Sequence, residues 1–149
     1  MHRTALAAIG LVVLSGIDVL AQQMDSTDAI HQRKELMKDN QEQMQALTGM
    51  SRGQVPFNIA TAQAALQQIE QNARQIPSLF LSHQERGPTA ALPVIWERKA
   101  DFDARAAKLE RDVTDALARI SDLGSLQVAI QQVGQNCGGC HETFRRKER

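Results

Sequence analysis

Apolar residues recur at steps of three and four along most of the chain, the spacing that places side chains on one face of an α-helix. The pattern predicts four amphipathic helices, of which the first runs from a cap region at residues 26–28 to about Gly49. The second runs from Pro56 to just before Pro77, the third starts near Pro93, and the fourth follows Gly124. Tyrosine is absent and aromatic residues make up 3% of the chain, a composition that favours helices over sheets.

Each predicted helix has one apolar stripe that we expect to face a common core. These stripes consist of Ile30, Met37, Met44 and Leu47; then Ile59, Ala62, Leu66, Ile69, Ala73 and Ile76; then Ile95, Phe102, Ala106, Leu109, Val113, Ala116 and Ile120; and finally Leu126, Ile130, Val133, Cys137, Cys140 and Phe144. Four such helices with short turns at both ends predict an all-α antiparallel four-helix bundle, whose interior can hold a cofactor. The middle connection, residues 78–92, is long for a bundle, and we expect it to wrap around something, with the edge of the cofactor as the candidate.

Both cysteines of the chain lie in the sequence Cys137-Gly-Gly-Cys140-His141 near the C-terminus. This is the covalent attachment motif of a c-type haem. Two thiolates can each add to a vinyl group of the ring while the neighbouring imidazole reaches the iron. On a helix these three side chains fall within a sector of about 100°, so the spacing suits that chemistry. The motif predicts one haem c, with thioether bonds to the two cysteines and His141 as axial ligand.

Three other interpretations of the same residues are disfavoured. A zinc site needs four nitrogen or sulfur ligands, and the only other histidines are His2, His31 and His83, with no second cysteine pair. A thioredoxin-like dithiol follows a β-strand, whereas the pattern before Cys137 is helical. A purely structural disulfide is the third. His31 lies off the inward stripe and His83 lies in the long connection, so we expect both at the surface.

The N-terminal segment has the features of a secretory signal. A short basic start precedes an apolar run from Ala5 to Leu14, and small or aliphatic residues follow at 19–21. We predict cleavage after Ala21, which would leave 22–149 as a single domain. The alternative is a membrane anchor, but Ser15, Gly16 and Asp18 interrupt a run that is already short for a span. Export to the periplasm agrees with haem attachment, which takes place outside the cytoplasm.

Charge gives little indication of a partner. The chain has 17 basic and 17 acidic residues, so neither nucleic acid nor membrane insertion of the mature chain is indicated. The C-terminal residues 145–149 are locally basic. A cationic last turn is favourable at the negative end of the helix dipole, and docking of an acidic partner is the alternative.

Four segments of the chain together resemble a known family. They are Arg33-Lys34-Glu35-Leu36-Met37, Gly53-Gln54-Val55-Pro56, Pro93-Val94-Ile95-Trp96, and the run from Cys137 to Arg145. They are similar to cytochrome c′ and its low-spin, methionine-ligated relatives, which are four-helix-bundle cytochromes with the haem motif near the C-terminus. The resemblance covers essentially the whole of the chain after the signal.

The resemblance implies roles for five further residues. Arg33 would lie beside a haem propionate and Met37 over the distal face of the iron, with Lys34 as a polar residue bordering the haem. Arg33 shares the inward stripe of its helix, and an arginine that faces a core needs an anion. Trp96 matches an aromatic position at the start of the family's third helix, where stacking near the haem and packing in the core are both open, and Arg145 matches a basic residue close to the axial imidazole.

Two functions follow from the resemblance, and Met37 decides between them. If its thioether binds the iron, the protein carries single electrons between redox partner proteins. If Met37 only packs, the iron is five-coordinate and open to small gases such as nitric oxide or carbon monoxide. The segment at Pro77 to Phe80 and the haem motif are more similar to the low-spin branch. An enzyme is not expected, because the first helix offers no distal histidine within a turn of Met37. A homodimer is common in the family.

Overall fold

The computed structural model describes residues 15–81 and 87–147, with side chains described from Asp28 onward. Its helices are α1 (Ser15–Ser51), α2 (Ile59–Gln75), the 3-10 turn η1 (Pro77–Phe80), α3 (Val94–Glu97), α4 (Lys99–Arg119) and α5 (Leu123–Phe144). Within these ranges the only β-type pairing is an isolated antiparallel bridge between Ala91 and Arg145. No helix in the described part of the chain is both long enough and apolar enough to span a bilayer.

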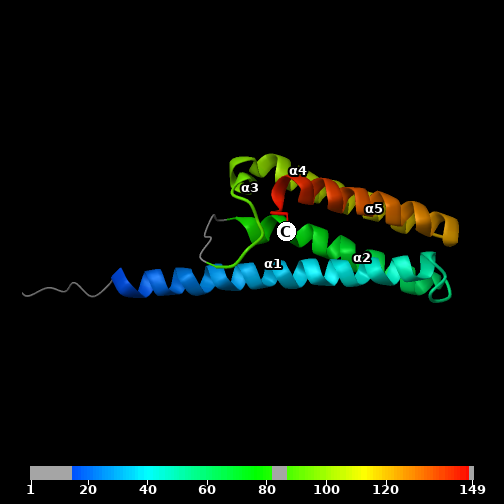
Figure 1. Cartoon of the computed structure of the whole chain (residues 1–149), viewed down its shortest axis with the longest axis horizontal. Helices are drawn as coiled ribbons and strands as arrows, with labels where there is room; N and C mark the ends of the chain where they lie inside the picture. The colour runs from blue at the N-terminus through cyan, green and yellow to red at the C-terminus, as the bar shows by residue number, and fades with distance from the viewer. Residues whose placement is uncertain (1–14, 82–86, 148–149) are drawn as a thin grey trace, which may run out of the picture.

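The four long helices form a closed ring. α1 contacts α2, α2 contacts α4, α4 contacts α5, and α5 returns to α1. Figure 1 shows that successive long helices run in opposite directions, as short connections require. The predicted antiparallel four-helix bundle is confirmed.

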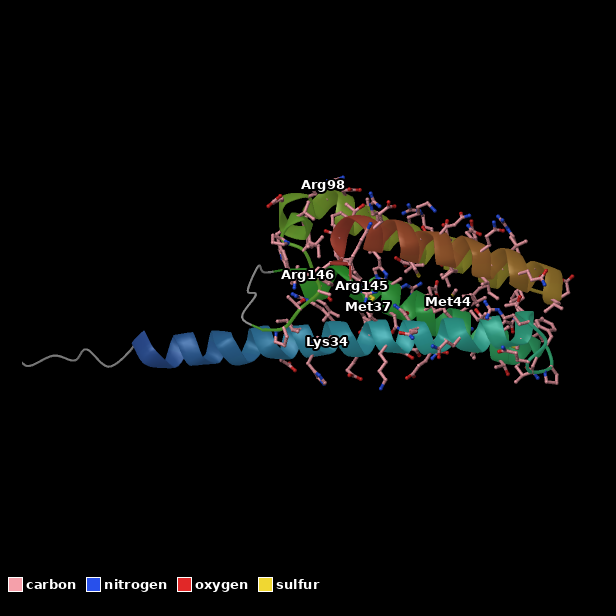
Figure 2. The ribbon with its side chains drawn as sticks, viewed as in Figure 1. Lys34, Met37, Met44, Arg98, Arg145 and Arg146 are labelled. Carbon is pink, nitrogen blue, oxygen red and sulfur yellow. The ribbon has the colours of Figure 1, made fainter. Side chains whose placement is uncertain are left out.

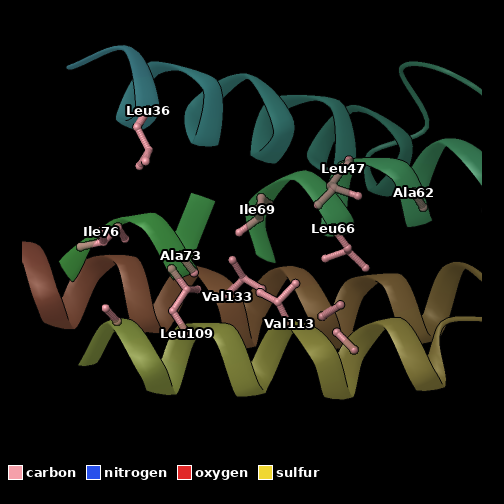
Figure 3. Packing of buried hydrophobic residues seen from close by; sticks show 14 of the residues in the cluster. Leu36, Leu47, Ala62, Leu66, Ile69, Ala73, Ile76, Leu109, Val113 and Val133 are labelled. Carbon is pink, nitrogen blue, oxygen red and sulfur yellow. The ribbon is translucent and has the colours of Figure 1, made fainter. Parts of the chain in front are cut away.

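The core is apolar and continuous across the ring. Every residue that the periodic pattern assigned to the inward face of the third predicted helix is buried, from Ile95 to Ile120. Figure 3 shows Leu109 and Val113 of α4 beside Ala73 of α2 and Val133 of α5, with Leu66 and Ile69 above them. Steps of three and four therefore located the core correctly in this part of the bundle.

The start of the first helix differs from the prediction. The predicted cap region at residues 26–28 lies inside α1, which begins at Ser15. A capping side chain starts a helix only where the preceding residues leave it, and residues 15–25 include no proline that would end the helix before Ser26. The predicted cleavage after Ala21 falls within α1 and stays a prediction, and residues 1–14 of the predicted signal lie outside the described ranges.

The second helix begins three residues later than Pro56. Asn58 is its N-cap, and its side-chain oxygen accepts a hydrogen bond from the Thr61 backbone N–H at 2.9 Å. Ile59, predicted to face the core, is 41% exposed because it is the first residue of the helix. The helix ends at Gln75, before Pro77, as predicted.

The third predicted helix is two helices. Arg98, with φ −121° and ψ 43°, separates α3 from α4. The fourth begins at Leu123, so Gly124 lies inside it and is not the separator that the sequence suggested. Asp122 and Ser125 form a reciprocal capping box that fixes this start.

The described part of the middle connection bridges α1 and the end of α5. A Cβ built at Gly87 would lie 3.1 Å from Ile30 Cδ1 of α1, so a larger residue would crowd that side chain. The Leu92 N–H donates to the Phe144 carbonyl at 3.0 Å, and the Arg146 N–H donates to the Ala90 carbonyl at 2.8 Å. These bonds fasten the connection to the C-terminal end of α5, and Figure 1 shows the connection passing that end of the bundle. That it wraps a haem edge stays a prediction, and residues 82–86, with His83, lie outside the described ranges.

Candidate haem site

The cysteine motif occupies the last two turns of α5. Cys137, Cys140 and His141 are all half-buried, and both cysteines pack against the core. Burial raises the pKa of Cys137 and that of Cys140. The two sulfurs are therefore uncharged in this environment and on the inward side of the helix, where thioether bonds to a buried ring could form.

The imidazole of His141 is held in its neutral form. Burial lowers its pKa, and the charge of Arg145 one turn later lowers it further. A neutral imidazole is the form that binds a metal through a nitrogen lone pair. The surroundings of His141 therefore favour the state that an axial ligand needs.

Arg33 is the one arginine among the buried residues described, with 7% of its surface exposed. Its Nε–H donates to the Leu79 carbonyl at 2.6 Å. The guanidinium carbon lies 4.2 Å from the centre of the Phe80 ring and 5.6 Å from that of Trp96, within cation–π range of both. The charge is thus held inside the bundle by η1 and α3, at the same end as the cysteine motif.

Met37 lies one turn after Arg33 on α1. Its side chain is half-buried and packs against the same core cluster as Cys137 and Cys140. Figure 2 shows Met37 at the end of the bundle where Arg145 and Arg146 leave α5, and α1 contacts α5. Met44, two turns further along α1, is also half-buried against this core.

The remaining residues suggested by the family resemblance have different positions. Lys34 is exposed on α1, and His31 is exposed as expected. Trp96 is half-buried on α3, with its ring centre 6.2 Å from that of Phe80. Arg145 caps the end of α5, and its side chain is exposed.

Sequence reasoning missed the contacts that α4 makes with the motif. Arg105 Nη1–H donates to the Gly139 carbonyl at 2.6 Å, inside the cysteine motif. Just before the motif, the Asn136 side-chain amide donates to Asp112 at 2.7 Å, and Lys108 donates to the amide oxygen of Asn136 at 3.1 Å. These partners are 24 to 34 residues apart in the chain, so no local spacing could have revealed them.

The donor set fits a haem c. Two cysteines pack against the core from α5, the half-buried His141 follows them directly, and a thioether and a buried guanidinium lie on α1, which α5 contacts. A haem has two carboxylates that a guanidinium can pair with and an iron that imidazole and thioether can bind. Over the described residues, no three histidine, cysteine or acidic side chains gather as a metal cluster, and no disulfide joins the two cysteines.

Comparison with known proteins agrees with this arrangement. The family model described as Cytochrome C′ matches residues 28–145. The chain is 35% identical to cytochrome c-556 of Rhodopseudomonas palustris over 99% of both chains. It is 40% identical to cytochrome c′ of the same species over 93% of each.

Solved structures agree as well. The structure of cytochrome c′ from Rhodopseudomonas palustris superposes with a TM-score of 0.78 at 39% identity, covering 82% of this chain and 98% of that one. Oxidised cytochrome c556 of that species gives a TM-score of 0.73 at 34% identity, over 83% of this chain and 99% of its own. The chain therefore belongs to the cytochrome c′ family of monohaem c-type cytochromes, which carry one covalently bound haem c.

Proposed function

We propose that the protein is a one-electron carrier whose haem is attached through Cys137 and Cys140 and whose iron is bound by His141 and Met37. The bound haem supplies the iron that takes up and gives back the electron. Members of the family are electron-carrying or ligand-binding haem proteins rather than typical enzymes. Choosing between these two roles depends on the distal side, where Met37 is the candidate ligand.

The packing of Met37 is the observation that supports ligation. Its side chain packs from α1 against the same core cluster that Cys137 and Cys140 contact from α5. Arg33, one turn before it, is buried and cationic, as a partner for a propionate should be. A ring attached to α5 and paired with Arg33 would lie along the part of α1 from which Met37 projects.

The other site residues have supporting roles in this proposal. Phe80, Trp96 and the Leu79 carbonyl orient the Arg33 guanidinium, while Lys34 and Arg145 add positive charge near the site. Six-coordinate ligation keeps small molecules from the iron and keeps the geometry nearly constant between oxidation states, which suits rapid electron transfer. Redox partner proteins would supply and remove the electron, and a homodimer fits the family.

An optical spectrum of the ferric protein tests the proposal. We expect the ferric protein to show the weak far-red band of methionine sulfur bound to iron. Met37→Ala should abolish this band and should allow carbon monoxide to bind when the protein is reduced. Met44→Ala is the matched control, because it removes another half-buried thioether from the same helix and should leave the spectrum unchanged. A high-spin spectrum in the parent protein, with ready carbon monoxide binding, would instead make it a five-coordinate gas-binding cytochrome c′.

The proposal includes export to the periplasm through the signal at residues 1–21. Its support is the basic and apolar start of the sequence and the need to attach haem outside the cytoplasm. N-terminal sequencing of the purified haem protein should begin at Gln22. A chain that retains Met1 while carrying haem would contradict the cleavage.

A further inference from the structure

The carbonyl that Arg105 contacts has a particular place in the motif. Gly139 C=O belongs to the peptide group whose nitrogen is that of Cys140, and His141 follows directly. The 2.6 Å bond from Arg105 Nη1 therefore fixes the orientation of the peptide that carries a thioether cysteine, one residue before the axial ligand. A Cβ built at Gly139 would lie 3.9 Å from the same nitrogen, so this side of α5 faces α4.

The Arg105 guanidinium is held from three directions. Besides Gly139, its Nε–H donates to Asp101 Oδ1 at 3.2 Å, one turn earlier on α4. Its guanidinium carbon lies 5.4 Å from the centre of the Phe144 ring, which is buried at the end of α5. Asp101 is in turn bound by Arg98 at 2.6 Å. These contacts favour one rotamer of Arg105, although its side chain is 34% exposed.

The charge of Arg105 acts on the motif itself. The Arg105 guanidinium lies 2.6 Å from the carbonyl oxygen of the Gly139–Cys140 peptide, and the Asp101 carboxylate lies 3.2 Å from Arg105 Nε. One positive and one negative charge therefore lie beside the proposed attachment point of the haem. A positive charge stabilises the reduced state of a nearby centre, and a negative charge stabilises the oxidised state.

We propose that Arg105 is a positioning residue for the proximal side of the haem, which orients the Gly139–Cys140 peptide one residue before His141 and, together with Asp101, adjusts the reduction potential. This rests on the proposed attachment at Cys137 and Cys140 and on ligation by His141. The role differs from that of Arg145, which acts from α5 itself. Here the adjacent helix α4 acts across a helix–helix interface.

Spectroelectrochemical titration of four haem-loaded variants tests the proposal. Arg105→Gln should lower the midpoint potential, and Asp101→Asn should raise it. We expect each substitution to change the ferric-to-ferrous ratio at a fixed applied potential about threefold, as for one partly exposed charge. This equals a shift of about 30 mV in the midpoint potential, because a tenfold change in the ratio corresponds to about 59 mV. Arg105→Lys keeps the charge and should stay near the parent potential.

Arg111→Gln is the matched control, because it removes an equal charge from an exposed position on the same helix. It should shift the potential much less than Arg105→Gln does. Equal shifts in these two variants, or shifts of the same sign for Arg105→Gln and Asp101→Asn, would overturn the role in potential.

Amide hydrogen exchange tests the positioning role separately. The N–H groups of residues 140–143 should exchange faster in both Arg105→Gln and Arg105→Lys than in the parent, because lysine cannot reproduce the forked contact with Gly139 and Asp101. Unchanged exchange in both would overturn that role. If the unmutated protein carried no covalent haem, or if its spectrum showed no histidine ligation, the proposed attachment and ligation would be contradicted instead. The two failures are therefore distinguishable.

Discussion

The α2–α4 interface and the α1–α5 interface are built from different kinds of side chain. Apart from Asn72, which binds α1, the buried residues of α2 and α4 are apolar and many are alanines, which let the two helices approach closely. On α1 and α5 the inward residues include the buried cation of Arg33, the thioether of Met37 and the two thiols of the motif. Apolar packing stabilises the bundle, whereas polarizable sulfur and buried charge offer chemistry. One half of the ring therefore provides stability and the other the site.

This division predicts that a cavity between α2 and α4 changes stability without changing the haem spectrum. Leu66 is fully buried, and Leu66→Ala should lower the free energy of unfolding of the haem-loaded protein by about 2–5 kcal/mol. Urea unfolding followed by circular dichroism measures the loss, and an optical spectrum checks the site.

The neighbouring Gln67→Ala serves as the control, because Gln67 is exposed and should change stability by less than about 0.5 kcal/mol. A Leu66→Ala variant with altered axial ligation would show that the two halves are not separable.

A polar network joins the two halves. The buried Asn72 of α2 donates to Asp39 at 2.8 Å and to Asn40 at 2.9 Å on α1, and it accepts from Gln68 at 3.1 Å. Asp39 and Asn40 follow Met37 by two and three residues. The network therefore fastens the ligand-bearing segment of α1 to the apolar half of the bundle.

Asn72→Ala should lower the free energy of unfolding by about 1–3 kcal/mol, because it leaves Asp39 and Asn40 without their α2 partner at a buried interface. Chemical denaturation of the haem-loaded variant measures the effect, and exposed Gln71→Ala is the control. If Asn72→Ala were as stable as the Gln71 variant, the network would not connect the two halves energetically.

The same division explains how much of the molecule could be predicted from sequence. Regular spacing identified the whole buried face from Ile95 to Ile120 because apolar burial repeats with the period of the helix. Spacing also placed Cys137 and Cys140 on the inward side of the last helix. Both results depend on contacts between near neighbours in the chain.

What escaped prediction depends on single residues or distant partners. The break at Arg98 and the cap at Asn58 each follow from one residue's backbone conformation or side-chain bond, which periodicity does not report. The bond from Arg105 to Gly139 joins residues far apart in sequence. Asn72 lies beside Ala73 and outside the predicted apolar stripe, so spacing predicted neither its burial nor its partners on α1.

The smallest expected effect is a pH dependence that the network adds to the stability of the bundle. Hydrogen bonds from Asn72 and then Gln43 hold the pKa of Asp39 below its ordinary value, against an opposing effect of burial. Because the folded pKa is lowered, the carboxylate stabilises the folded state above its unfolded pKa of about 3.9. That stabilisation is lost as the pH falls below this value and through the lowered folded pKa.

Urea unfolding of the haem-loaded parent and of Asp39→Asn between pH 7 and pH 3 measures this contribution. The parent should lose more stability than the variant below about pH 5, because only the parent has the Asp39 carboxylate to protonate. Asp115→Asn removes an exposed carboxylate from α4 and should follow the parent. If the free energy of unfolding fell equally with pH in the parent and in Asp39→Asn, the hydrogen bonds to Asp39 would be equally stabilising whether its carboxyl group is charged or neutral. The junction between the two halves would then be insensitive to acid, and only the apolar half would limit the stability of the bundle at low pH.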